Sequence, residues 1–205
     1  MKHICMLLGL ALLSCGGPQK KDKPGSQKEV AAAEPEAPEF FELRTYYCNP
    51  GKLEDLLTRF EDHTMSLFEK HGMVNLGYWV PLENTENTLV YLMGYPSRTA
   101  RDTAWEAFMN DPEWQKVWED SKSDGPLVDS VVNRFLRYTD YSPVWEFEAY
   151  GPRIFALRTY YTHPGKLGEL HARFRDHTLE IFENNGMTNI AYFTPDTADS
   201  GADHT

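Results

Sequence analysis

Cysteine is scarce in this chain of 205 residues, which contains three: Cys5, Cys15 and Cys48. The chain also lacks a CxxC pair, an HExxH helix, a GxSxG elbow, a phosphate-binding loop and a dinucleotide fingerprint. Metal, nucleophilic-serine and nucleotide chemistry therefore have no local motif behind them. We expect no metal site and no bound cofactor.

Basic residues are also few. Lysine and arginine number 20 against 31 aspartates and glutamates, which gives a net charge of −11 at pH 7. No stretch concentrates enough base to hold a phosphate backbone, so nucleic acid is not an expected partner. The apolar run at 4–13 is too short to cross a bilayer as a helix.

The N-terminus has the form of a bacterial lipoprotein signal. A basic start at 1–3 and the apolar run 4–13 lead into Leu12-Leu13-Ser14-Cys15, in which aliphatic residues and a small residue precede the cysteine that is lipidated after cleavage. An ordinary secretory signal with an incidental Cys15 is the alternative, but the small-residue–cysteine junction favours lipidation. We predict that residues 1–14 are a signal peptide and that a lipid anchor at Cys15 holds the protein in the cell envelope. Because Gly16 lacks the acidic character of inner-membrane retention signals, we expect the outer membrane.

The anchor would leave one free thiol and a long tether. Cys5 would depart with the signal and Cys15 would carry lipid, so Cys48 could form no intrachain disulfide. Residues 15–39 are rich in Pro, Gly, Lys, Glu and Ala without apolar periodicity, which predicts a disordered tether. Its typical reach is on the order of 25 to 30 Å.

Residues 41–81 are written a second time at 155–195, with a constant offset and no gap. The repeat predicts a tandem duplication, with a first domain at 40–141, a linker at 142–153 and a second domain at 154–205. The second copy breaks off where a strand equivalent to 89–95 should begin. We therefore expect it to be truncated and the chain to be a fragment.

One unit has the order strand, helix, strand, strand, helix, strand. The expected strands are 40–47, 74–80, 89–95 and 130–138, and the expected helices run from 49–50 to Gly72 and from the cap Ser97 to 125–126, with a restart at 111–112. This order predicts an α+β fold of the ferredoxin-like βαββαβ type. Its helices cover one face of the sheet, so a second unit, from the same chain or from a homodimer, should cover the other.

Several motifs of this unit together resemble the NIPSNAP family. They are FELRTYYCNPGK at 41–52, DHT at 62–64, GYW at 77–79, AWEAF at 104–108 and DPEW at 111–114. The resemblance implies a dimeric α/β-barrel, in which two ferredoxin-like units place their open sheet faces around a small lumen. Related barrels include monooxygenases of antibiotic biosynthesis and haem-degrading enzymes, whereas NIPSNAP proteins have no agreed catalytic chemistry.

The first strand supplies the main candidate ligand-binding residues. Glu42, Arg44 and Tyr46 alternate with the set expected to face the helix, so in a barrel they should point into the lumen. In the second copy Arg44 recurs as Arg158 and Tyr46 as Tyr160. The arginine could bind a carboxylate or polarise a carbonyl, or it could pair with a carboxylate of the facing unit and serve the interface, which is the more ordinary role of a buried charge.

Histidine and tryptophan give weaker candidates. His63, which recurs as His177, lies at the margin of the helical apolar stripe and could act as an acid or base, but a packed histidine is favoured. Three further histidines are expected at the surface: His71, His163 and His171. Four aromatic residues, Trp105, Phe108, Trp114 and Trp118, could form a flat ligand platform, yet at helical spacing they favour a core role.

Two functions remain open from the sequence. The first is a non-catalytic module, tethered to a membrane, that binds a small ligand or an envelope protein. The alternative is a cofactor-independent or haem-related enzyme of the monooxygenase kind that holds its substrate in the lumen. The lack of a recognisable acid–base pair or metal motif favours the first.

Overall fold

The structure, a computed structural model, describes residues 37–145 and 153–196. The predicted signal peptide, the predicted lipidation site Cys15 and the predicted tether up to residue 36 lie outside the described residues. Within the two described ranges no helix is long and apolar enough to cross a membrane.

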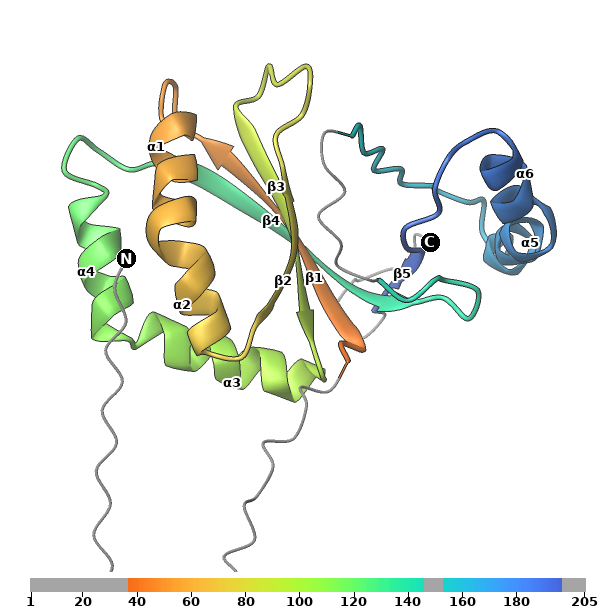
Figure 1. Ribbon diagram of the computed structural model, residues 1–205, viewed down its shortest axis with the longest axis horizontal. Coiled ribbons are helices and arrows are strands. Elements are labelled where there is room, and N and C mark those ends of the chain that lie inside the picture. Colours follow the sequence, from red (N-terminus) through yellow and green to blue (C-terminus); the bar gives the residue numbers. More distant parts are fainter. Residues whose placement is uncertain (1–36, 146–152, 197–205) are drawn as a thin grey trace, which may run out of the picture. The chain divides into compact units, whose positions relative to one another are not determined.

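A five-stranded antiparallel sheet is the centre of the fold (Figure 1), in the order β2-β3-β1-β4-β5. Its strands are β1 (Phe40–Cys48), β2 (Val74–Trp79), β3 (Thr88–Tyr95), β4 (Val128–Tyr138) and β5 (Phe193–Pro195). The first four strands belong to the first copy and have the ferredoxin-like arrangement, with β3 between β1 and β2. The predicted α+β fold class is therefore confirmed, and β1 is held by neighbours on both edges.

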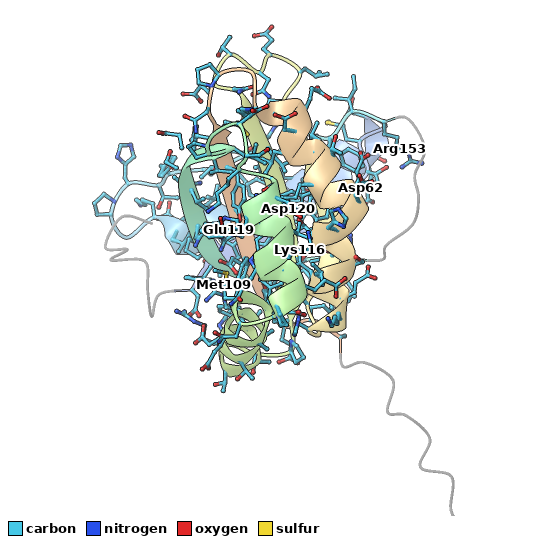
Figure 2. All side chains as sticks on the ribbon, turned by 90° about the vertical axis from the view of Figure 1, so that its left-hand side faces the viewer. Asp62, Met109, Lys116, Glu119, Asp120 and Arg153 are labelled. Carbon is cyan, nitrogen blue, oxygen red and sulfur yellow. The ribbon has the colours of Figure 1, made fainter. Side chains whose placement is uncertain are left out.

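Helices of the first copy cover one face of this sheet (Figure 1). They are α1 (Leu53–Arg59), the π-helical turn η1 (Phe60–Thr64), α2 (Met65–Lys70), α3 (Arg98–Met109) and α4 (Pro112–Asp120). Seen from the helix side in Figure 2, α1 and α4 lie in front of the strands, and Lys116, Glu119 and Asp120 project from the outer surface of α4. The core beneath is strongly aromatic, with Phe60, Phe68 and Tyr91 in mutual ring contact.

The helix ends follow the predicted signals. Ser97 caps α3 by accepting a hydrogen bond from the backbone N–H of Ala100 at 3.1 Å, and Asp111 caps α4 by accepting one from Glu113 at 2.8 Å. Gly72 has φ +75°, as expected for a left-handed residue after α2. The first helix begins later than predicted, at Leu53, because 49–51 form a turn.

The surface prediction for His71 is wrong. The side chain of His71 is 16% exposed, and its Nε2 lies 2.7 Å from Oδ2 of Asp111, the cap of α4. Lys70 pairs with the same carboxylate at 2.8 Å. Hydrogen bonds from Lys70 and His71 to the Asp111 carboxylate hold the pKa of Asp111 well below its usual range. The end of α2 is therefore fastened to the start of α4 by an ionised carboxylate.

The turn η1 was not predicted and interrupts a helix that otherwise runs from α1 to α2. Its five residues follow the wider π geometry, and the Thr64 hydroxyl donates to the carbonyl of Arg59 at 3.1 Å. In a π turn each residue advances less far round the helix axis than in an α-helix. His63 therefore falls short of the apolar stripe and is exposed, whereas Arg59, Phe60 and Thr64 are buried.

The second copy forms a corresponding helix, made of α5 (Leu167–Arg173), the π turn η2 (Phe174–Thr178) and α6 (Leu179–Asn184). Asn189 bonds the carbonyl of Leu179 at 3.0 Å, as Asn75 bonds that of Met65 at 3.1 Å. Of the expected second sheet, the described residues contain β5 alone. The segment 155–161 has no strand partner there, and it leaves apolar side chains such as Leu157 and Tyr161 exposed.

Residues after β4 support the second copy. Thr139 donates its backbone N–H to the carbonyl of Tyr192, and Tyr192 donates its own to the Ser142 hydroxyl. Tyr141 packs its ring against Tyr192 and Phe174, with ring centroids 5.7 and 6.5 Å away. In the first copy, Tyr91 of β3 makes the corresponding contacts with Tyr78 and Phe60. The turn at 139–142 thus supplies a ring and hydrogen bonds that a third strand supplies in the first copy.

Candidate functional site

A buried carboxylate on β1 organises the face of the sheet beneath the helices. Glu42 is fully buried, and its Oε1 accepts hydrogen bonds from Arg44 at 2.6 Å and from Arg101 of α3 at 2.7 Å. Its Oε2 accepts from Arg101 Nε at 2.9 Å and from Trp105 Nε1 at 3.0 Å. Burial opposes ionisation of Glu42, but the hydrogen bonds and charges of the two arginines outweigh it and lower its pKa.

These contacts overturn the orientation expected from the sequence. Glu42, Arg44 and Tyr46 do not point away from the helices into a lumen but lie between the sheet and the helices. The opposite face carries Phe41 and Leu43. Alternation along β1 was correct, but both faces carry aromatic residues, so the pattern alone did not decide which one the helices cover. The carboxylate partner of Arg44 comes from its own strand, not from a facing unit.

Arg44 is surrounded by aromatic side chains. Its guanidinium carbon is 4.3 Å from the ring centroid of Trp105 and 5.5 Å from that of Tyr46, and Nη2 lies 3.4 Å from the Tyr46 hydroxyl. Burial works against its charge, but Tyr91, Tyr46 and Glu42 outweigh burial and raise the pKa of Arg44. Its buried Nε has no hydrogen-bond partner in the described structure.

A second arginine reaches the same space from the end of α1, just before the π turn. Arg59 is 8% exposed, donates from Nη1 to the Ser121 hydroxyl at 3.1 Å and lies 5.3 Å from the Trp114 ring. Among the described residues no carboxylate forms an ion pair with it, and its buried Nε is without a partner. Burial lowers the pKa of Arg59, although Tyr46, Tyr91 and Cys48 act in the opposite direction. An arginine still remains protonated at pH 7.

These side chains line a pocket of about 320 Å³ between the sheet and the helices. Its lining residues are Arg44, Tyr46, Arg59, Phe60, Thr64, Phe68, Trp105, Phe108, Met109, Trp114, Trp118, Lys122, Pro126, Leu127, Val128 and Val131. Figure 2 looks onto the helices that cover it and labels Met109 where α3 gives way to α4. The chemistry of this wall is aromatic and apolar, with two buried guanidinium groups and one lysine.

Only part of the predicted site is brought together. Arg44 and Tyr46 line the pocket, whereas His63 is exposed. Arg158 and Tyr160 of the second copy are exposed, and so is His177. The structure therefore does not give the second copy an enclosed site like that of the first within the described residues.

The sequence also contains features that indicate further pocket residues, and these were not predicted. Arg59 recurs in the second copy as Arg173, which marks it out as clearly as the recurrence of Arg44 does. Of the aromatic set assigned to the core, Trp105, Phe108 and Trp114 pack there, whereas Trp118 is 44% exposed. All four line the pocket. Core residues therefore also form part of the pocket wall.

The unit that carries this pocket coincides with a known domain. Residues 41–143 match the family model described as NIPSNAP. The chain belongs to the NIPSNAP family. Its family region begins in β1 and ends just after β4, so Arg44, Arg59 and the pocket lie within the NIPSNAP domain.

A named relative is similar to part of this chain. The human protein NipSnap homolog 3A is 32% identical over 78 residues, which cover 38% of this chain and 31% of that protein. This NIPSNAP chain therefore matches less than a third of the length of that relative.

Solved structures of NIPSNAP proteins are also similar. A NIPSNAP domain protein from Burkholderia xenovorans is 23% identical with a TM-score of 0.45, over 51% of this chain and 98% of that one. A NIPSNAP family protein of unknown function from Agrobacterium tumefaciens is 23% identical with a TM-score of 0.47, over 53% of this chain and 96% of that one.

Proposed function

We propose that this NIPSNAP protein is a non-catalytic binding module that takes a small organic molecule into the pocket between its sheet and helices. The observation that carries the proposal is the pocket of about 320 Å³ walled by aromatic side chains from η1, α2, α3 and α4. Small-molecule sites are typically concave and apolar, with a few placed polar groups. Here Arg44, Arg59 and Tyr46 are those groups.

The residues that line the pocket favour ligand binding over catalysis. Among the residues that line the pocket in the described structure there is no histidine, cysteine, aspartate or glutamate. Apart from its arginines the wall offers Tyr46 and Lys122 as titratable groups, and Lys122 is engaged with Glu119 at 3.0 Å. An acid–base pair, which the monooxygenase-like alternative could use, has no support in this set.

Filling the pocket should weaken ligand binding strongly. Val131 lines the pocket and is 41% exposed, so a Val131→Trp variant can place its ring in the cavity at little cost to the core. We expect at least a tenfold loss of affinity, measured by quenching of tryptophan fluorescence and by calorimetry against a panel of apolar acids, amides and alcohols.

The neighbouring residue gives a matched control. Val132 is 44% exposed and pairs with Thr45, whereas Val131 pairs with Tyr46, so the two valines lie on opposite faces of β4. Val132→Trp should bind as the wild type does. Equal affinities in both variants, or no binding of any compound to the wild type, would argue against this function.

We further propose that the module acts at the bacterial cell envelope, tethered through Cys15. Expressed in a bacterial host, the full chain should yield a mature protein that begins at Cys15 and carries a diacyl or triacyl group, because Leu12 to Cys15 has the pattern of a lipoprotein cleavage and lipidation sequence. Mass spectrometry of the N-terminal peptide tests this, with Cys15→Ser as the control that cannot be lipidated. An unmodified product cleaved elsewhere would contradict the proposal.

A further inference from the structure

We infer that the ligand of this pocket is an organic monocarboxylate, with its anionic group on Arg59 and its apolar body against the aromatic wall. The inference rests on the proposed binding function and names the class of molecule that the pocket takes.

The first support is the charge of Arg59 itself. Its side chain is more than nine-tenths buried, lines the pocket, and forms no ion pair with any carboxylate of the described residues. A buried cation without a counterion is costly, and buried charges are normally paired. A carboxylate in the pocket would supply the missing partner and bond the unused Nε.

Neighbouring carboxylates do not balance the positive charge of Arg59. Glu42 is the buried carboxylate of the region, and it is already shared by Arg44 and Arg101. It makes no hydrogen bond to Arg59 among the contacts of the described structure. Arg44 and Arg101 share Glu42, and Arg101 also pairs with Asp102 at 3.1 Å, so this network has no negative charge left over for Arg59.

The position of Arg59 suits a planar anion. Ser121 fixes one end of the guanidinium at 3.1 Å and Trp114 lies 5.3 Å from it, so its orientation is set before a ligand arrives. Guanidinium matches carboxylate geometry through two parallel N–H donors. Preorganisation of this kind lowers the cost of binding.

The rest of the pocket limits the ligand to one anionic group. Lys122, the further cation of the wall, lies with Nζ 3.2 Å from the Trp118 ring centroid and pairs with Glu119. Arg44 is held by Glu42. The remaining wall is aromatic and aliphatic, which favours an apolar body and disfavours a second charge.

Matched pairs of compounds test the inference on the full mature chain. Phenylacetate, indole-3-acetate and decanoate are each titrated beside their primary amides, which keep the shape and lose the charge. We expect the acid of the best-fitting pair to bind about 10 to 150 times more tightly than its amide, the range for a hydrogen bond to a charged group. Inorganic phosphate is included as the competing anion.

Two arginine variants locate the effect. Arg59→Met should remove the preference for acid over amide while leaving amide binding in place. Arg173→Met makes the same change at the exposed counterpart in the second copy and should retain the preference. If Arg59→Met fails to fold, the comparison of acid and amide binding to the wild type still tests whether the pocket prefers a carboxylate.

Each outcome has a distinct meaning. Equal binding of acid and amide to the wild type would overturn the carboxylate inference and leave the binding function intact. No binding of any pair would remove the proposed function as well. Tighter binding of inorganic phosphate than of every acid would replace carboxylate with phosphate as the ligand class, and loss of the acid preference in Arg173→Met would place the anion elsewhere.

Discussion

A Glu42→Gln variant is expected to lower the free energy of unfolding by about 3 to 5 kcal/mol, the usual cost of breaking a buried ion pair by removing one partner. Glu42 is fully buried and bonds Arg44, Arg101 and Trp105. The amide removes the negative charge and leaves the buried Arg44 without its carboxylate, whereas the half-buried Arg101 keeps its pair with Asp102. Urea denaturation of the full chain at pH 7, followed by tryptophan fluorescence, measures the change.

The dependence of stability on pH gives a second test of the role of Glu42. Its pKa is lowered in the folded state, so its contribution is present above the ordinary glutamate pKa of about 4.3 and is lost as the pH falls below that value toward the lowered pKa. The wild type should lose the part of its stability that Glu42 contributes as the pH falls through this range. The Glu42→Gln variant lacks that contribution and should not lose it. Glu39→Gln, at an exposed position just before β1, is the control and should change stability by no more than about 0.5 kcal/mol. Equal stabilities of the Glu42 variant and the wild type at pH 7 would mean that the carboxylate is not ionised in the fold.

Truncation of Phe68 should have an effect of similar size. Its ring is 1% exposed and lies 4.9 Å from Phe108 and 5.5 Å from Trp105 between ring centroids. Removal leaves a cavity that those rings cannot fill without moving, so Phe68→Ala should cost about 3 to 5 kcal/mol of unfolding free energy. Thermal and urea unfolding measure it.

The second copy supplies the matched variant. Phe182 occupies the position of Phe68, but it is half-buried, and its ring contact is with Phe174 at 6.5 Å. Phe182→Ala should therefore cost clearly less than Phe68→Ala. Equal losses would show that the second copy packs as tightly as the first, contrary to the structure.

Local signals predicted most of the fold because each depends on neighbours in sequence. Ser97 and Asp111 act as caps, and Gly72 ends its helix with a positive φ, since capping and left-handed backbone are decided within a few residues. The strand order followed from the element order alone. These features needed no knowledge of the packing.

The site was harder to predict because it depends on contacts between distant residues. Glu42 faces α3 because Arg101 and Trp105, some sixty positions further on, satisfy its charge. Periodicity indicated two faces on β1 but could not say which one met those partners. His63 was misplaced for another reason: its angle was counted on an α-helix, and η1 is a π turn.

The π turn also determines where this domain can change length. In an α-helix of 3.6 residues per turn, loss of one residue rotates everything beyond it by about 100°, which would swing Leu67 and Phe68 out of the core. A π turn holds one residue more than an α turn, so a single deletion within η1 can revert it to α-helix and keep α1 and α2 in phase. A single deletion is thus tolerable at one place in the helix, next to Arg59. There a change in chain length could reshape the pocket wall without dismantling the scaffold.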